Sequence, residues 1–579
     1  MRMPRKFIIP ALFLSLAFFL PVESWGQVPS SDQLIKNQLT DDDVRANWLE
    51  EFNLTLNSFY LRSKSLSSQN EFYLSFKLSP FSTLPGFAIT DPVKFESLAA
   101  PSPNRPRATI ELLTLMTISG VDYWHKYGQF LEDWQYRPVW RDQKKRFFSL
   151  QAHRFDHNNF RLNWRHSLAG MIYYELARSN NLPWWNSMLY SLGGSLYWEY
   201  IVEWREVISI SDNIMTGFGG YILGESWFQL GRYFFNSPRK VSYYLSWLNP
   251  LNRINGWLEG RDKPLSPHFY PFNYQAQDVF LFLGYRNSPT STSGRNVGNM
   301  FFQFGSELFI EPVYGLPGKV NETFTSPIYS SLDYSLTYHG WKREELELRA
   351  RVIPLGKFIQ KIDEDKNGYS LIYGLGSAFH TYLKRPVTDY DAGKVKITDT
   401  AGFHFEEPRN FRDKMGSVHL LGPVVDGTYY KSDWSFRFSG EAYFSFGMIN
   451  ALALNKYSLD HDVQGMKTTV TCYGYYYALG PALTAMAEID HSAFRLRGFA
   501  SYIYYRSIQG LTELQYEVTD DSVIKDSRWQ TGIQFQWRLP IDNLSLFSSI
   551  EWVRRWGIVH EVTDRTLEKR YYLGLKYNL

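Results

Sequence analysis

In the C-terminal half of the chain, apolar and polar side chains alternate one by one. Within the segment 529–539, Trp529 and Ile533 fall on one face of an extended chain, and Gln530 and Gln534 fall on the other. Successive side chains of a β-strand point to opposite sides, so a segment of this kind has one apolar and one polar face. The alternation therefore predicts strands over this half of the chain.

Twelve segments follow this pattern, and they lie at 276–285, 299–311, 332–338, 346–352, 368–384, 416–430, 434–446, 467–480, 492–506, 529–539, 543–554 and 570–579. Roughly 9–11 residues suffice to cross a bilayer at a tilt, and many of the segments are that long. A soluble β-sandwich also alternates, but long strands with large aromatic side chains on the apolar face favour a membrane protein. We expect a mainly β fold with an α insert: a transmembrane antiparallel β-barrel of about 12 strands (12–14), with longer external loops at 387–414 and 455–466.

Ahead of the predicted barrel, the apolar positions change to helical spacing. Three segments show it, at 166–179, 184–205 and 212–235. Ser211 or Asp212 is expected to cap the third helix. Glycines concentrated in these segments permit close approach between helices. We expect a helical block that plugs the barrel or caps its periplasmic mouth.

The N-terminus has the layout of a secretory signal peptide. Arg2, Arg5 and Lys6 precede an apolar run at 7–22 and small residues at 24–26. A retained N-terminal anchor is the alternative, but the apolar run is short for a membrane span. The predicted organisation is a signal peptide at 1–26, an N-terminal linker or irregular region at 27–107, the helical block at 108–265 and the barrel at 266–579. A signal peptide ahead of a barrel predicts the outer membrane of a Gram-negative-type bacterium.

Composition narrows the possible functions. Aromatic residues make up 17% of the chain, which suits the apolar faces and interfacial girdles of a membrane barrel. A mean hydropathy of −0.33 excludes a polytopic helical membrane protein. The formal net charge is +3 without a basic block, so no nucleic-acid partner is expected. The single cysteine, Cys472, excludes a disulfide framework within the chain and a multi-thiolate metal site.

The helical block places ionisable side chains within apolar sequence, where burial perturbs pKa values. Glu199 and Glu203 lie four residues apart, so they project from one helix face. Three interpretations stay open: buried ion pairs with His166 and Arg178 that lock three helices together, a catalytic or metal site, and a ligand-binding site. The catalytic candidates are His166, Glu199, Glu203, Asp212 and Glu225, and the candidates for a structural or ligand network are Asn163, Arg178, Ser179 and Asn213. No metal ion or cofactor is predicted.

Several motifs in this block resemble those of a known protein family in their order and spacing. The motifs are HSLAGMIYYELARS (166–179), LGGSLYWE (192–199) with Glu203, SDN (211–213), GG (219–220), LGE (223–225) and LNP (248–250) with Arg253. They resemble an uncharacterised bacterial envelope family, catalogued as a domain of unknown function, whose members combine this helical block with a predicted barrel. Ser167 and Ala169 depart from the family, which commonly has proline and histidine at these two positions. The resemblance implies an envelope location and no assigned activity.

Taken together, these patterns predict an outer-membrane barrel that acts in solute passage or in envelope structure and maintenance. The alternative is an outer-membrane enzyme that modifies an envelope lipid or glycan with the His, Glu and Asp cluster. The segment 571–579 resembles the C-terminal assembly signal of such barrels, although Leu579 stands where an aromatic residue is usual. The expected partners are outer-membrane lipids, the barrel-assembly machinery, and a small solute or an envelope lipid.

Overall fold

The computed structural model describes residues 102–127, 135–156, 160–237, 240–260, 272–288, 298–384, 394–398, 404–408, 413–463, 465–471, 473–511 and 520–579. The predicted signal peptide and almost all of the predicted N-terminal region lie outside the described residues. The helices and the barrel strands belong to one compact unit. The antiparallel pair β9 (Lys394–Thr398) and β10 (His404–Pro408) belongs to a second unit.

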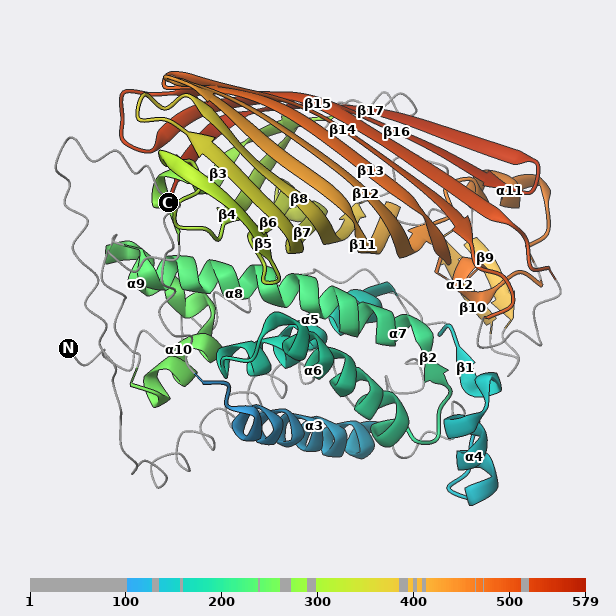
Figure 1. Ribbon diagram of the computed structural model, residues 1–579. Coiled ribbons are helices and arrows are strands. Elements are labelled where there is room, and N and C mark those ends of the chain that lie inside the picture. Colours follow the sequence, from blue (N-terminus) through green and yellow to red (C-terminus); the bar gives the residue numbers. More distant parts are fainter. Residues whose placement is uncertain are drawn as a thin grey trace. The chain divides into compact units, whose positions relative to one another are not determined.

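Twelve strands of the described residues form one closed antiparallel β-barrel (Figure 1). Successive barrel strands pair around the wall, and β17 pairs with β3 to close it. The strands are β3 (Asp278–Asn287), β4 (Gly298–Phe309), β6 (Tyr329–His339), β7 (Lys342–Ile362), β8 (Gly368–Lys384), β11 (Asp413–Lys431), β12 (Trp434–Asn450), β13 (Tyr475–His491), β14 (Phe494–Ser507), β15 (Ile524–Arg538), β16 (Leu544–Val559) and β17 (Val562–Asn578). The predicted barrel of about 12 strands is confirmed.

Three short elements accompany the barrel. Strand β5 (Gly318–Phe324) pairs with the last residues of β7. Helices α11 (Leu454–Asp460) and α12 (Thr468–Thr471) lie in the connection between β12 and β13. The strand predicted over 467–480 therefore begins only at Tyr475. The β-branched run before it folds as a helix because Val470 packs into a hydrophobic core, and tertiary packing outweighs strand propensity.

The two ends of the barrel carry different connections. At one end, called here the short-turn end, turns at 363–367, 432–433, 492–493 and 539–543 join neighbouring strands, and both the start of β3 and the C-terminus lie there. At the other end, called the long-loop end, neighbouring strands are joined by the segments 288–297, 385–412, 451–474 and 508–523, beside two tight turns. The connection 310–328, which contains β5, also lies at the short-turn end, so most but not all of the long connections lie at the long-loop end.

The register shows which face of the wall points outward. Successive partners form one row of side chains, namely Tyr577, Leu281, Phe304, Tyr334 and Leu348. Tyr577 on β17 is 45% exposed, whereas Tyr334 on β6 and Leu348 on β7 are 7% and 2% exposed. All five side chains project from the same outer face. Some part of the chain must therefore cover β6 and β7 from outside.

The helical block contains the three helical segments that the sequence predicts. Its helices are α3 (Arg105–Tyr127), α4 (Trp140–Phe148), α5 (Phe160–Ser179), α6 (Trp184–Tyr197) with the π-helix η5 (Trp198–Val202), α7 (Ile210–Ile214) with the π-helix η6 (Met215–Gly219), α8 (Gly220–Asn236), α9 (Lys240–Leu245) and α10 (Pro250–Leu258). Among the described helices, none has both the length and the apolar character needed to cross a membrane.

The cap of α7 differs from the prediction. Ser209, and not Ser211 or Asp212, is the N-cap residue, and its hydroxyl accepts a hydrogen bond from the backbone N–H of Asp212 at 3.2 Å. The reason is that Ile208 and Ser209 pair with His153 and Arg154 as a short parallel ladder, so the helix can begin only after this pairing ends.

The helical block covers the outer face of the barrel wall. Trp227 and Leu230 of α8 share one hydrophobic core with Leu332 and Leu348, whose side chains point away from the lumen. Figure 1 shows α8 running along this wall. The predicted plug or periplasmic cap is therefore wrong. The physical reason is that the outer face of β6 and β7 offers an apolar surface to α8, whereas the lumen is polar and charged.

Candidate functional site

Glu225 of α8 forms the central ion pair of the helical block. Its fully buried carboxylate accepts hydrogen bonds from Arg178 Nε at 2.8 Å and Arg178 Nη2 at 3.1 Å. Tyr174 and Gln229 donate to the same carboxylate. Burial opposes the ionisation of Glu225, but the Arg178 guanidinium outweighs it and holds the pKa of Glu225 below its ordinary value. Two of the predicted candidates, Arg178 and Glu225, thus neutralise each other between α5 and α8.

The other acidic candidates gather at the opposite end of the block. His166 Nε2 lies 3.5 Å from Asp212 Oδ2. The backbone N–H of Ser209 donates to Glu199 Oε2 at 2.7 Å, and the indole of Trp198 donates to Glu203 Oε1 at 2.7 Å. Both glutamates thus accept hydrogen bonds from neutral donors.

Burial is also the main electrostatic influence on this acidic group. Desolvation, followed by the neighbouring charge of Glu203, raises the pKa of Glu199 well above its ordinary value. Desolvation and then the charge of Glu206 raise the pKa of Glu203 in the same direction. The Arg178 guanidinium donates instead to Glu225, so the predicted pairing of Arg178 with these two glutamates is not formed. Both shifts favour the protonated, neutral form of the carboxyl group.

Arg146 is a site residue that the sequence does not single out. It lies in a basic run on α4, yet its side chain is fully buried. Its guanidinium donates to the backbone carbonyls of Glu199 at 2.5 Å, Glu203 at 2.9 Å and Trp204 at 2.9 Å. The last carbonyls of a helix lack partners within the helix, so Arg146 caps the end of η5. Nothing in the run WRDQKKRFF distinguishes this arginine from its exposed neighbours.

A third polar group joins α5 to α10. Ser179 Oγ accepts from Asn255 Nδ2 at 2.9 Å and donates to the carbonyl of Glu175 at 2.6 Å. Asn249 Nδ2 donates to Glu175 Oε2 at 3.0 Å. Asn213, another candidate, donates to the backbone carbonyl of Ser209, the N-cap residue of its helix. The side chain of Asn163 lies outside the described residues.

Small residues bring α5 and α8 together more closely than larger side chains would allow. A Cβ added at Gly170 would lie 2.0 Å from the carbonyl oxygen of Thr216, and one at Gly220 would lie 2.4 Å from Gly170. Ser191 of α6 donates to the carbonyl of Thr216 at 2.7 Å. Close backbone packing of this kind requires glycine at both positions. The glycines of the motif therefore have a packing role here.

The arrangement of the candidates bears on what chemistry is available. The predicted catalytic candidates fall into two separate sets, one around Glu225 and one around Asp212. Within the described ranges, no group of three His, Cys, Asp or Glu side chains is placed to hold a metal ion. The polar groups of the block mainly connect one helix to another.

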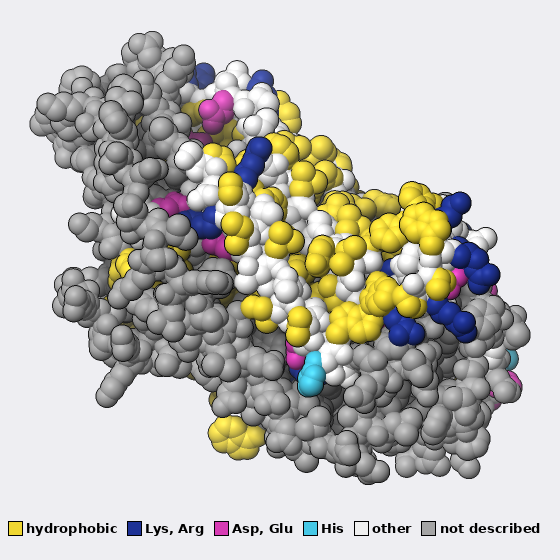
Figure 2. Space-filling model, turned by 90° about the horizontal axis from the view of Figure 1, so that it is seen from below, with side chains coloured by type: hydrophobic (Ala, Val, Ile, Leu, Met, Phe, Trp, Pro, Cys, Tyr) yellow, Lys and Arg dark blue, Asp and Glu magenta, His cyan; other side chains and the backbone are white. Residues whose placement is uncertain are grey.

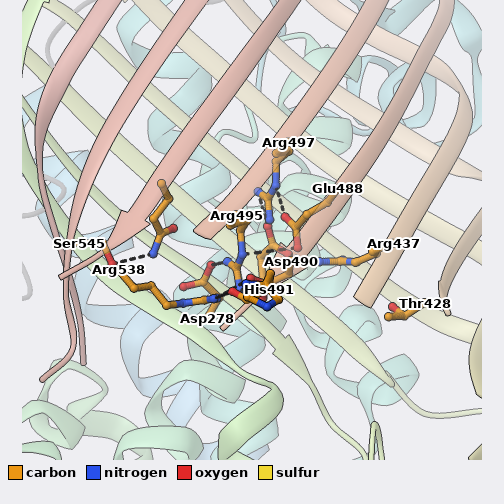
Figure 3. Close-up of polar contacts among 12 residues, drawn as sticks. Asp278, Thr428, Arg437, Glu488, Asp490, His491, Arg495, Arg497, Arg538 and Ser545 are labelled. Carbon is orange, nitrogen blue, oxygen red and sulfur yellow. Dashed lines mark hydrogen bonds and ion pairs between the residues drawn. The ribbon is translucent and has the colours of Figure 1, made fainter. Parts of the chain in front are cut away.

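The lumen holds a second charged site, which the sequence predicts only as a polar strand face. Near the short-turn end, Asp278 of β3 accepts from Arg495 of β14 at 2.5 Å (Figure 3). It also accepts from Lys576 of β17 at 3.0 Å. Glu307 of β4 pairs with Arg497 of β14 at 2.9 Å and with Arg437 of β12 at 2.5 Å. The pair of Asp278 with Lys576 joins the neighbouring strands β3 and β17, whereas the other three pairs join strands that are not neighbours in the sheet.

Similar contacts continue toward the long-loop end. Arg349 on β7 donates to Gln530 on β15 at 3.0 Å, and these two strands stand six places apart in the closed order of twelve, on opposite sides of the barrel. Glu345 of β7 pairs with Arg286 of β3 at 2.8 Å and with Arg570 of β17 at 3.1 Å. Charged side chains thus bridge the lumen along most of the barrel.

Comparisons with known proteins match parts of this picture. Residues 152–248 match the family model "Domain of unknown function (DUF3943)", which agrees with the resemblance found in the helical block. No curated protein is significantly similar to the chain. Solved structures similar to the barrel include the beta domain of the Bordetella autotransporter Brka, with 10% identity, a TM-score of 0.21 and coverage of 52% of this chain and 100% of that chain.

Two further solved structures are similar at the same level. The translocator domain of the autotransporter NalP from Neisseria meningitidis has 8% identity and a TM-score of 0.21, over 52% of this chain and 88% of that chain. The Acinetobacter baumannii outer membrane protein Omp33 has 6% identity and a TM-score of 0.17, over 52% of this chain and 99% of that chain. None of these similarities indicates an activity for this chain.

Proposed function

We propose that this protein is an outer-membrane β-barrel with a closed lumen, and that it serves envelope structure or maintenance rather than open diffusion of solutes. The observation that carries the proposal is the set of polar contacts between opposite walls, such as Arg349 with Gln530 and Glu307 with Arg437. An open pore needs a continuous aqueous path, and side chains that meet across the lumen interrupt it.

The uncovered part of the outer wall supports a membrane location. Trp529, Ile533, Trp537 and Leu573 point outward from β15 and β17 and are 49%, 54%, 56% and 57% exposed. A band of exposed apolar and aromatic side chains around charged interior positions is the arrangement that membrane barrels use. By the usual orientation of such barrels, the short-turn end faces the periplasm and the long-loop end faces outward.

The enzymatic alternative gains no support from the comparisons, because the matching family has no assigned function. The uncovered outer faces of β15 and β17 are called here the bare wall. An outer-membrane location would make outer-membrane lipids direct partners of this bare wall. Insertion by the barrel-assembly machinery and contact with a small solute remain expectations.

Electrical recording in planar lipid bilayers tests the closed lumen. Wild-type protein is expected to show no steady porin-like conductance. Replacing Glu307, Arg437 and Arg497 together by alanine removes lumen-crossing side chains, so conductance steps several-fold above the wild-type baseline are expected. The matched control replaces Glu364, Lys361 and Lys431, which carry the same charges but are exposed, by alanine, and it should stay silent. A wild-type conductance as large as that of the lumen variant would contradict the proposal.

A further inference from the structure

The outermost helix of the block, α3, carries an apolar stripe that no described part of the chain covers. Ile110 and Val121 are 63% and 66% exposed, and Leu113 and Ile118 between them are 46% and 41% exposed. Their spacing places them on one helix face. Between 108 and 121 the helix contains one charged residue, Glu111, which is buried and accepts a hydrogen bond from Asn180. This exposed face is therefore free of charge over about four turns.

Helix α6 adds a second stripe of the same kind. Trp185, Leu189 and Leu196 are 48%, 51% and 40% exposed and follow one face of the helix. Gly194 of α6 packs against Met116 of α3, so the two helices are neighbours. Figure 2 looks onto the side of the molecule where α3 lies in Figure 1, and hydrophobic side chains occupy much of its described surface.

The polar groups on these two exposed faces are bonded within the protein. The hydroxyls of Thr114 and Thr117 donate to the carbonyls of Ile110 and Leu113, one turn earlier, at 2.7 Å each. Thr109 and Tyr190 bond to each other at 2.7 Å. Threonine side chains bonded back to their own helix need no water, which is how hydroxyls are accommodated in an apolar medium.

The position of the helical block against the barrel wall indicates what surrounds the exposed faces of α3 and α6. Helix α8 covers Leu332 and Leu348 on the outer face of β6 and β7. Leu348 belongs to the same row of outward side chains, formed by successive strand partners, as an exposed residue of β17. If lipid surrounds the bare wall at this depth, the helical block takes the place of lipid on the covered wall. The outer surface of the block must then itself meet the lipid.

The part of the helical block around α4 agrees with this placement. Phe155, which follows α4 closely, donates its backbone N–H to the carbonyl of Leu511 at the long-loop end. On α4, Trp140 and Phe148 are 73% and 75% exposed beside the exposed cations Lys144 and Lys145. Aromatic and basic side chains together suit the boundary between lipid headgroups and acyl chains.

We propose that the outward faces of α3 and α6 contact lipid acyl chains, so that the helical block, and not the barrel alone, forms the membrane-facing surface of this protein. The proposal rests on the proposed membrane location. The helices need no independent ability to cross the bilayer, because their other faces pack on protein.

Spin labelling of the full chain in liposomes tests this contact. Single cysteines at Leu113 and Leu189, in a Cys472→Ala background, would carry nitroxide labels, and both sites are exposed, so the labels should not disturb packing. Leu573 on the bare wall serves as the lipid reference, and Asp433 in an exposed turn serves as the water reference. Oxygen, which partitions into acyl chains, and a water-soluble nickel chelate report the surroundings of each label.

We expect the ratio of oxygen to nickel collision rates at Leu113 and Leu189 to match Leu573 and to exceed Asp433 several-fold. Labels at Leu113 and Leu189 that resemble Asp433, while Leu573 keeps its lipid signature, would overturn this inference and leave the membrane location standing. Loss of the lipid signature at Leu573 as well would overturn both. Labels at Leu113 and Leu189 shielded from both reagents would show that protein, such as a second copy, covers this face, and would also overturn the inference.

Discussion

Two parts of the barrel wall have the same sequence pattern but different surroundings. On β6, Leu332 and Tyr334 alternate with Asp333, and on β17, Leu573 and Leu575 alternate with polar or small residues. Leu332 is 2% exposed and Leu573 is 57% exposed. On both strands, the alternation identifies the face whose side chains point away from the lumen. It does not identify what lies against that face.

The contrast has a physical origin in the helical block. Helix α8 is buried on nearly all sides, between the wall and α5, so it needs an apolar surface on both of its flanks. The outward rows of β6 and β7 supply one such surface, and the face of α5 around Gly170 and Tyr174 supplies the other. Between α5 and α8, the buried charges of Arg178 and Glu225 pair with each other.

The largest expected effect comes from breaking the buried ion pair inside the helical block that covers β6 and β7. Glu225→Gln leaves the buried Arg178 guanidinium without a carboxylate, so the helical block should lose about 3–5 kcal/mol of stability. Hydrogen exchange of α8 measures this loss, while the strands β15–β17 should keep wild-type exchange. The double variant Glu225→Leu with Arg178→Met removes both charges and should recover most of the stability. Unchanged exchange of α8 in Glu225→Gln would contradict the role of this pair.

A second prediction compares the two walls directly. Leu332→Ala opens a cavity in a packed protein core and should cost about 2–4 kcal/mol, because neighbouring side chains fill it only in part. Leu573→Ala should cost clearly less, because fluid acyl chains can occupy the vacated space. Denaturant unfolding of both variants in the same lipid would measure the difference. Equal losses would mean that the two walls are covered alike.

The smallest expected effect concerns pH. Burial raises the pKa of Glu199, so above its ordinary pKa the unfolded chain releases a proton that the folded block retains. The block should therefore lose stability as pH rises from the ordinary glutamate range toward the raised pKa. Glu199→Gln should remove a share of this dependence, about 1 kcal/mol per pH unit for one proton. Glu364→Gln, at an exposed turn, is the control, and an unchanged slope in Glu199→Gln would refute the assignment.

Much of the fold follows from local pattern. The twelve predicted strands agree with the observed ones because each strand has its own period-two signal, as in Leu332 to Leu336. The strand predicted around 467–480 is wrong at its start, because Thr468–Thr471 is β-branched yet helical where Val470 enters a core. Local propensity is a weak guide at such a position.

The candidate site was predictable in its residue types but not in its pairings. Arg178 and Glu225 lie 47 residues apart and meet only because α5 packs against α8. Arg146 belongs to a run that has the composition of a solvated helix, and only the fold buries it. Both outcomes depend on helix packing, which a single sequence does not encode in any local spacing.

By itself, the sequence determined the period of each segment, and hence the barrel, the helices and the two faces of every strand, because periodicity is a local property of the chain. Only the tertiary structure decided that the helices lie against the outside of the wall and that charged side chains bridge the lumen. The reason is that both results depend on contacts between parts of the chain far apart in sequence, such as those of α8 with β6 or of Arg349 with Gln530. Leu332 and Leu573 have the same pattern around them, and their different surroundings follow from those contacts alone.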